Sequence, residues 1–303
     1  MLDLVVVGHL SHDQIIVPTG SSEALGGSAA YVSLVASRLG LSVGIVSTVG
    51  RDFKEDYAKT LTEAGVDTAG IVRTVGRTTS FRNIYEGGKL SRQELLGLSH
   101  SIRSTDLPAL YHGSTGIHFG PLLDEIDREA IPLWSSQAEF TSLDIQGLCR
   151  VSRVGSSVVP ARNPKLNRYL AYVEMVKATS SEAAIATGEE DPSRASARLH
   201  DSGPEIVLVT LGEQGAFLSV RGRTEEVPVF PPAKLVDPTG AGDAFVGGFI
   251  YSYLETNDVY RSALIGSCVA SFVVEDVGPR GIPSPDMVNK RLIESGYDLR
   301  FNT

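Results

Sequence analysis

Short apolar runs alternate along this chain with longer segments of helical period. Residues 2–8 and 43–50 have the length and composition of buried strands. Between them, segment 28–40 repeats apolar residues on one face of a helix, and Gly40 supplies the stop. The scheme recurs later, with strands predicted over 140–146 and 205–212 and helices over 166–176 and after Gly242. This alternation predicts βαβ units around a mostly parallel sheet, an α/β fold.

One segment interrupts this rhythm. Between Asp67 and Leu98 the pattern changes to short β-like pieces, with Gly87-Gly88 as a hairpin signal. We expect a small sheet formed by roughly 11–18 and 68–97, inserted into a single α/β domain spanning 1–303. Such a sheet near the carboxyl ends of the parallel strands would act as a lid over a ligand. A surface excursion without a gating role is the alternative.

Composition narrows the class of protein. The chain has 303 residues, 42% of them hydrophobic, which is enough for a large buried core. No apolar run reaches the length of a membrane helix and the first residues include an acid, so we expect a cytoplasmic protein. A net charge of −9 argues against nucleic acid or a membrane surface as the partner. Cys149 and Cys268 are too few and too far apart for a redox unit, and we expect both to be buried.

The stretch DPTGAGDAF, residues 237–245, carries the strongest chemical signal. Pro238 and the two glycines disfavour a helix, whereas the apolar run that follows favours one, so GAGD lies at a helix N-terminus. The free amides and the helix dipole there make an anion site. A carboxylate among them, Asp243, would repel a resident phosphate but would suit the base that deprotonates a hydroxyl attacking a travelling phosphoryl group. The structural alternative is a turn followed by an acid that complements the dipole.

Other phosphate and metal signatures are missing from the sequence. It contains no GxxxxGK[ST] motif, and the first predicted strand ends in a single glycine, VGHLSHD, instead of a dinucleotide fingerprint. The six histidines form no HExxH or HxH arrangement, which leaves no signal for a metal hydrolase.

With DPTGAGDAFVGGF near its C-terminus, the chain resembles the ribokinase-like (PfkB) family of carbohydrate kinases over nearly its whole length. The paired glycines at 26–27, VGRDF at 49–53, TLGEQGA at 210–216 and the β insertion fall in family order. The resemblance implies a three-layer sandwich with a mostly parallel central sheet, a small β-sheet lid, and ATP with Mg²⁺. It also implies Asp243 as catalytic base, with anion-hole amides from Gly240, Ala241 and Gly242. The nucleotide would lie against Thr210, Gly212, Gly215, Ser267 and Ala270.

The resemblance also places the acceptor along the exit of the first strand, the paired glycines and the lid. Asp13 matches the carboxylate that holds sugar hydroxyls in the family, and an exposed turn acid is the alternative. Tyr31 is the clearest departure, because the family usually has asparagine there, which weighs against ribose and nucleosides. It would form an aromatic wall of the pocket or a plain core residue. The remaining predicted acceptor residues are Ser11, Gly26, Gly27 and Ser28.

Three residues match family positions near metal ions. Glu182 matches a glutamate that organises the water shell of Mg²⁺, although Thr179 with Glu182 also forms a capping box that explains both residues. Asp237 and Thr239 match positions that bind a monovalent cation such as K⁺ in many relatives, and an Asx-type turn is their structural alternative.

The leading hypothesis is an ATP-dependent kinase of a small neutral sugar or polyol. The segments GGSAAY, HFGPL and DIQGLCR resemble the family branch with archaeal myo-inositol kinases, which slightly favours that substrate. A kinase of a phosphorylated sugar would use a basic clamp, for which Arg73, Arg77, Arg82, Lys89 and Arg92 are candidates. A nucleoside kinase and a non-catalytic sensor of a sugar or nucleotide are further hypotheses. A homodimer through the lid would follow if an apolar face of the lid were exposed.

Overall fold

The structure is a computed structural model that describes residues 1–18, 20–86 and 89–299. Its main element is a nine-stranded sheet in the order β15-β14-β13-β12-β9-β8-β1-β4-β5. The seven strands from β13 to β5 pair in parallel, and β14 and β15 add an antiparallel edge. The strands are β1 (Leu4–Val7), β4 (Val43–Val49), β5 (Asp67–Arg73), β8 (Gly116–Phe119), β9 (Phe140–Asp144), β12 (Met175–Thr179), β13 (Ile206–Thr210), β14 (Ala216–Val220) and β15 (Arg223–Val227).

Helices cover both faces of this sheet. Successive side chains of its strands point to opposite sides, and because these side chains are apolar on both sides, both faces must be shielded from water. In β1, Leu4 and Val6 pack into one hydrophobic cluster, and Val5 and Val7 into the other. The first cluster involves α1 (Ser28–Leu39), α2 (Glu55–Glu63), α7 (Ala241–Thr256), α8 (Val259–Val273) and α9 (Pro285–Glu294). The second involves α3 (Ala130–Ser135), α4 (Leu166–Leu170), α5 (Ser180–Thr187) and α6 (Pro192–His200). The predicted three-layer α/β fold is confirmed.

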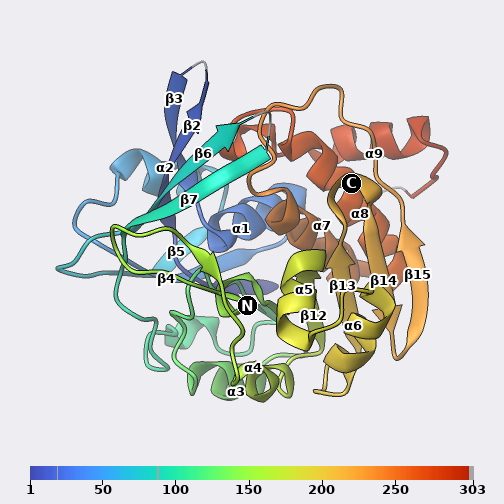
Figure 1. Ribbon diagram of the computed structural model, residues 1–303, viewed down its shortest axis with the longest axis horizontal. Coiled ribbons are helices and arrows are strands. Elements are labelled where there is room, and N and C mark those ends of the chain that lie inside the picture. Colours follow the sequence, from blue (N-terminus) through green and yellow to red (C-terminus); the bar gives the residue numbers. More distant parts are fainter. Residues whose placement is uncertain (19, 87–88, 300–303) are drawn as a thin grey trace.

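A separate four-stranded sheet has the order β3-β2-β6-β7 and projects over the main body at the upper left of Figure 1. It consists of β2 (Ser11–Val17), β3 (Gly20–Gly26), β6 (Thr79–Glu86) and β7 (Lys89–Gly97), and we call it the small sheet. β2 pairs with β6 in parallel, and the other two pairings are antiparallel. It joins segments that are more than 50 residues apart in sequence, as the interrupted pattern predicts.

The boundaries of this sheet differ from the prediction in two places. Residues 68–73 belong to β5, which pairs with β4 at the edge of the main sheet, because a half-buried edge strand has the same pattern as a strand of a small sheet. Residues 20–26 form β3, which the sequence did not suggest because its first four residues are polar or glycine and exposed. The predicted hairpin at Gly87-Gly88 lies outside the described residues.

The predicted helix over 166–176 is also wrong in its second half. α4 ends at Leu170, and Met175 already begins β12, a buried central strand. The apolar residues of a short buried strand continued the helical period of the preceding segment, so periodicity alone did not separate them. This strand delivers Lys177 and Thr179 to the site described below. Both cysteines are free and buried, as predicted.

Candidate active site

The N-terminus of α7 forms one wall of a cavity of about 280 Å³. Gly240 caps the helix with φ of +79°, a conformation that favours glycine, and a Cβ there would also collide with the ring of Tyr31. The first regular bond of the helix runs from the Ala244 N–H to the Gly240 carbonyl at 2.8 Å. The N–H of Ala241 donates to the Pro238 carbonyl at 3.3 Å, which leaves the amides of Gly242 and Asp243 as the stronger anion donors of this turn.

A buried ion pair supports this helix end from below. Lys177 Nζ lies 2.7 Å from Asp144 Oδ2, and both side chains are almost fully buried. A Cβ built on Gly242 would lie 3.0 Å from Lys177 Nζ, so the ammonium sits directly against the first turn of α7. Burial alone would lower the pKa of Lys177, but the carboxylates of Asp144, Glu182 and Asp243 raise it well above its usual range. A fixed positive charge therefore lies beside the predicted anion hole.

The predicted base, Asp243, is half-buried and lines the same cavity. Burial raises its pKa from 3.8 to about 6, while Lys177 opposes this shift and Asp144 adds to it. The carboxylate is thus ionised at neutral pH but has a higher proton affinity than an exposed aspartate. This is the adjustment expected of a general base that works near neutral pH.

The acceptor residues predicted from the sequence meet opposite Asp243. The cavity is lined from the core and from the small sheet, and its walls include Ser11, Asp13, Gly27, Ser28, Tyr31, Phe81, Asn83, Tyr85, Gly242 and Asp243. The buried Ser28 hydroxyl lies beside Asp243, and its interaction with that carboxylate opposes the rise of the Asp243 pKa that burial causes. Gly26 stands behind Asp13 instead of lining the cavity.

The Asp13 carboxylate is held in place by Ser11 and Gly26. Ser11 Oγ donates to Asp13 Oδ1 at 2.8 Å, and the other carboxylate oxygen lies over Gly26, where a Cβ would collide with it. Burial raises the pKa of Asp13 to about 6, and the bond from Ser11 opposes this shift. Gly26 is therefore required by the position of Asp13. Gly27 is required by its φ of +95° and by the nearby His9 carbonyl.

Changing Gly26 to Ala should therefore raise KM for the acceptor by roughly 10- to 100-fold, because the added methyl group displaces the Asp13 carboxylate. Steady-state kinetics of Gly26→Ala, Asp13→Ala and the double variant test this. If the effect runs through Asp13, the double variant matches Asp13→Ala alone. Additive losses would contradict this explanation.

Four polar side chains connect the small sheet to the core across the cavity. Arg150 donates to Gln93 Oε1 at 3.2 Å, Gln93 Nε2 donates to Asn83 Oδ1 at 2.8 Å, and Asn83 Nδ2 lies 3.5 Å from Asp13 Oδ2. The chain of bonds begins at a cation and ends at an anion, so each amide has one orientation that satisfies both neighbours. We call these residues, Asp13, Asn83, Gln93 and Arg150, the polar chain.

Tyr31 is 2% exposed, and its ring packs on Gly240 while lining the cavity. The Tyr31 ring therefore supports the turn at Gly240, where the anion hole is predicted. This structural role weakens the argument that the sequence drew from Tyr31 against a ribosyl acceptor. On the other side, the Tyr85 hydroxyl of β6 hydrogen-bonds to Thr239 Oγ1. The small sheet is thus linked directly to the loop that precedes α7.

The predicted nucleotide residues gather around one turn at the far end of β13 to β15. The Gly215 backbone packs on the Val227 carbonyl, and Ser267 Oγ donates to the next carbonyl, that of Pro228, at 2.6 Å. Gly212 has a φ of +61° and open space around its Cα, which leaves its backbone accessible. Thr210 ends β13, and Ala270 is half-buried on α8. Ser267 thus orders the loop through its own hydrogen bond.

The predicted metal residues are engaged in local structure. Glu182 Oε2 accepts from the Thr179 N–H at 2.7 Å in a full capping box, which leaves Oε1 for other partners. Asp237 accepts from the Thr239 N–H at 2.9 Å, which is the bond of the Asx-type turn, and also from the distant Gly278 N–H at 3.4 Å. Within residues 1–18, 20–86 and 89–299, no three His, Cys, Asp or Glu side chains form a metal-binding group.

The basic side chains considered for a phosphate clamp do not form one in the described part of the chain. Arg73 lies in β5 and pairs with Glu55 at 2.8 Å. Arg82 and Arg92 both pair with Glu94, at 3.1 and 2.6 Å, and Arg77 is exposed. The side chain of Lys89 lies outside the description.

Sequence reasoning missed the ion pair of Lys177 with Asp144 and most of the polar chain. These residues come from β6, β7, β9, β12 and the segment after β9, and only the topology brings them together. The segment DIQGLCR was noted for its resemblance to one branch of the family, without a role for Asp144 or Arg150. A cation inside a buried strand, such as Lys177 in MVKAT, is the signal that could have revealed the pair.

Comparison with known proteins identifies the family and the fold of the chain. The chain is 32% identical over 258 residues to the cytidine kinase of Thermococcus kodakarensis, covering 84% of this chain and 89% of that protein. A solved pyrophosphate-dependent kinase of the ribokinase family, complexed with a pyrophosphate analog and myo-inositol, matches with a TM-score of 0.80 and 23% identity over 91% of this chain and 96% of that one. Arabidopsis thaliana ribokinase complexed with ribose and ATP matches with a TM-score of 0.77 and 19% identity over 96% and 98%.

The two solved structures show the shared fold. No helix among the described residues is long and apolar enough to cross a membrane. Residues 1–287 match the profile of the pfkB family carbohydrate kinases, and together with the identity to a curated relative this shows that the chain belongs to that kinase family.

Proposed function

We propose that the protein transfers the γ-phosphoryl group of ATP to a hydroxyl of a small uncharged polyhydroxylated acceptor, with Asp243 as general base. The supporting observation is the meeting of three features in one cavity. The raised-pKa carboxylate of Asp243, the amides of the first turn of α7, and the hydroxyl-binding carboxylate of Asp13 all lie around it. Inositol, ribose and the ribosyl part of a nucleoside all have the hydroxyl groups that such a cavity binds.

In this mechanism Asp13 accepts hydrogen bonds from two acceptor hydroxyls and so turns a third toward Asp243. Asp243 takes the proton of that hydroxyl as its oxygen attacks the phosphorus, and the bond from phosphorus to the ADP oxygen breaks. The amides of Gly242 and Asp243, with the Lys177 ammonium beside them, stabilise the charge that develops on the transferred group. The contact of Tyr85 with Thr239 excludes water from this corner on the side of the small sheet.

Mg²⁺, when bound, would neutralise charge on the donor phosphates. The described residues fit a metal held mainly by phosphate and water, because only one oxygen of Glu182 is left free by the capping box and no cluster of acidic ligands is present among them. Glu182 would then contact the ion through water. A role for Asp237 and Thr239 with K⁺ remains part of the proposal, although both Asp237 oxygens already accept hydrogen bonds.

A screen for phosphorylated product tests the function. Purified protein is incubated with ATP and Mg²⁺, or with pyrophosphate and Mg²⁺, and with inositols, pentoses, hexoses, sugar phosphates or nucleosides. Mass spectrometry then detects product regardless of the donor. We expect transfer from ATP to at least one uncharged acceptor and none in the Asp243→Asn variant. Transfer only to sugar phosphates, or from pyrophosphate alone, would contradict the acceptor or donor part of the proposal.

Activity should fall as the pH drops below about 6. Asp243 and Asp13 must both be ionised to work, and the pKa of each is raised to about 6. In the plot of log kcat/KM against pH, the slope on the acid side should therefore exceed one and approach two. The measurement covers about pH 5 to about pH 8, with circular dichroism as the control for folding. Constant kcat/KM down to about pH 5 would contradict both assignments.

A further inference from the structure

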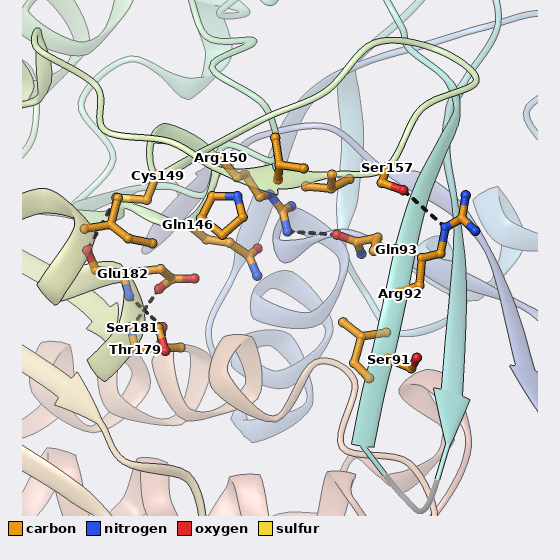
Figure 2. Close-up of a pocket in the computed structure, with 15 residues that line it drawn as sticks. Ser91, Arg92, Gln93, Gln146, Cys149, Arg150, Ser157, Thr179, Ser181 and Glu182 are labelled. Carbon is orange, nitrogen blue, oxygen red and sulfur yellow. Dashed lines mark hydrogen bonds between the residues drawn. The ribbon is translucent and has the colours of Figure 1, made fainter.

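A second cavity of about 470 Å³ opens beside the acceptor cavity, and we call it the distal cavity (Figure 2). The two cavities share five lining residues, which are Leu90, Gln93, Gln146, Arg150 and Thr179. The distal cavity therefore lies directly next to the acceptor cavity, and Gln93 and Arg150 of the polar chain line both. A monosaccharide or an inositol has no second group to place there.

The walls of the distal cavity leave aliphatic surface uncovered. Leu90 of β7 is 49% exposed and Val159 is 48% exposed, and both line the cavity from different elements. Val159 belongs to β11 (Val159–Pro160), which pairs with β10 (Arg150–Val151). Ile185 of α5 and Pro160 add further apolar surface. A flat ring between such side chains would remove this surface from water.

The polar groups of the distal cavity suit a neutral ligand with both donors and acceptors. Gln93 and Arg150 point toward each other across it, and Gln146 lies beside them (Figure 2). Arg150 Nε is fixed by the Leu122 carbonyl at 2.7 Å, so its orientation is set without a ligand. Amide and guanidinium groups of this kind recognise the edge of a heterocycle.

An anionic group without a bound metal ion suits the same cavity poorly. Arg92, the other cation in its wall, donates to Ser157 Oγ at 3.1 Å and forms an ion pair with Glu94 at 2.6 Å. Glu182 brings a carboxylate to the opposite wall. Among the described lining residues, Arg150 is bonded to an amide and a carbonyl, Arg92 is already neutralised, and Glu182 adds a carboxylate, so an anion without a metal ion gains little there.

The cavity is also built as a defined space. Segment 155–158 pairs with the free edge of β7 through backbone bonds from Leu95 N–H to the Ser156 carbonyl at 3.0 Å, Gly155 N–H to the Leu95 carbonyl at 2.8 Å and Val158 N–H to the Gln93 carbonyl at 2.8 Å. These bonds tie the segment that leads into β11 to β7, so the positions of both elements in the cavity wall are fixed together. Both apolar walls are therefore positioned in advance of ligand binding.

From these observations we infer that the acceptor is a nucleoside whose base occupies the distal cavity while its ribosyl group lies between Asp13 and Asp243. This inference rests on the proposed function and adds the chemical class of the substrate. The base stacks between the Leu90 and Val159 sides, and Gln146 and Arg150 read its edge. The 5′-hydroxyl, as the exocyclic primary alcohol of the ribosyl group, is the one directed to Asp243.

The test compares acceptors that differ only by the base. The kcat/KM of the wild-type protein is measured with cytidine, uridine, adenosine and inosine, and with ribose and myo-inositol. At least one nucleoside should exceed ribose by about 30-fold or more, because ring burial adds binding energy that ribose lacks. The variant Val159→Trp fills the cavity and should lower kcat/KM for that nucleoside at least about 10-fold, with ribose changing by less than about 2-fold. Val154→Trp is the matched control, since Val154 lies in the connection between β10 and β11, is 59% exposed and does not line either cavity.

Failure of the inference and failure of the proposed function give different results. Transfer to ribose or inositol that equals or exceeds transfer to every nucleoside overturns the inference and leaves the kinase function intact. Equal losses for ribose and nucleoside in Val159→Trp overturn it as well. Absence of transfer to any acceptor overturns the proposed function. In that case calorimetry with the same nucleosides and ribose tests the distal cavity directly. Binding of a nucleoside that is lost in Val159→Trp supports the inference. Absence of nucleoside binding to the wild-type protein overturns the inference.

Discussion

Replacing Asp243 by Asn is expected to lower kcat by a factor of at least about 10², because the amide keeps the shape of the side chain but cannot accept the proton of the attacking hydroxyl. The nucleotide should still bind, since the predicted nucleotide residues lie around the turn at Val227 and Pro228. Steady-state kinetics and equilibrium binding of ADP measure the two effects separately. Asp13→Asn is the contrasting variant, because it should act mainly through KM for the acceptor.

The same substitution should stabilise the folded protein. The folded-state pKa of Asp243 is raised from 3.8 to about 6, so the folded state binds this proton more readily than the unfolded state. Stability is therefore lost as pH rises from about 4 to about 6, and the loss persists at neutral pH. Asn removes it, which should raise the free energy of unfolding at neutral pH by up to about 3 kcal/mol. Normal turnover, or lower stability, of Asp243→Asn in urea unfolding would contradict the assigned role.

Replacing Lys177 by Met should destabilise the protein by about 3–5 kcal/mol, because it leaves the Asp144 carboxylate buried without its partner. The double variant Lys177→Met with Asp144→Asn should recover much of this stability, since no unpaired charge is left behind. Chemical denaturation of the three proteins measures the difference.

Activity should behave differently from stability in this pair. The double variant still lacks the positive charge against the first turn of α7, so kcat should stay at least about 10-fold below that of the wild type. A double variant that regains both stability and full kcat would mean that the ion pair is only structural. One that regains stability alone supports an electrostatic contribution of Lys177 to phosphoryl transfer.

Local patterns made part of this site predictable from the sequence. The start of α7 follows from Pro238, Gly240 and the apolar run after Asp243. These signals are close together in the sequence. The parallel sheet follows from the alternation of apolar runs and helical segments. Both features depend on near neighbours in the chain, where sequence carries most information.

The remaining features depend on contacts between distant segments. The polar chain joins residues 13, 83, 93 and 150, whose meeting requires the pairing of β2 with β6 and the position of the segment after β9. The edge strand β5 resembled the small sheet because both have one covered face. The distal cavity depends on segment 155–158 lying along β7, and nothing local in that segment indicates this pairing. Register between remote strands is the information that local patterns lack.

Contacts beyond the polar chain also attach the small sheet to the rest of the protein. Glu23 of β3 forms an ion pair with Lys54, and the Tyr85 hydroxyl of β6 hydrogen-bonds to Thr239. Backbone hydrogen bonds join β7 to segment 155–158. For protein engineering, this means that the sheet is not an exchangeable module. A chimera that imports the sheet of a relative to change acceptor preference would also need that relative's counterparts of segment 155–158, Lys54 and Thr239. Without them, mismatched contacts would disturb the proposed catalytic site.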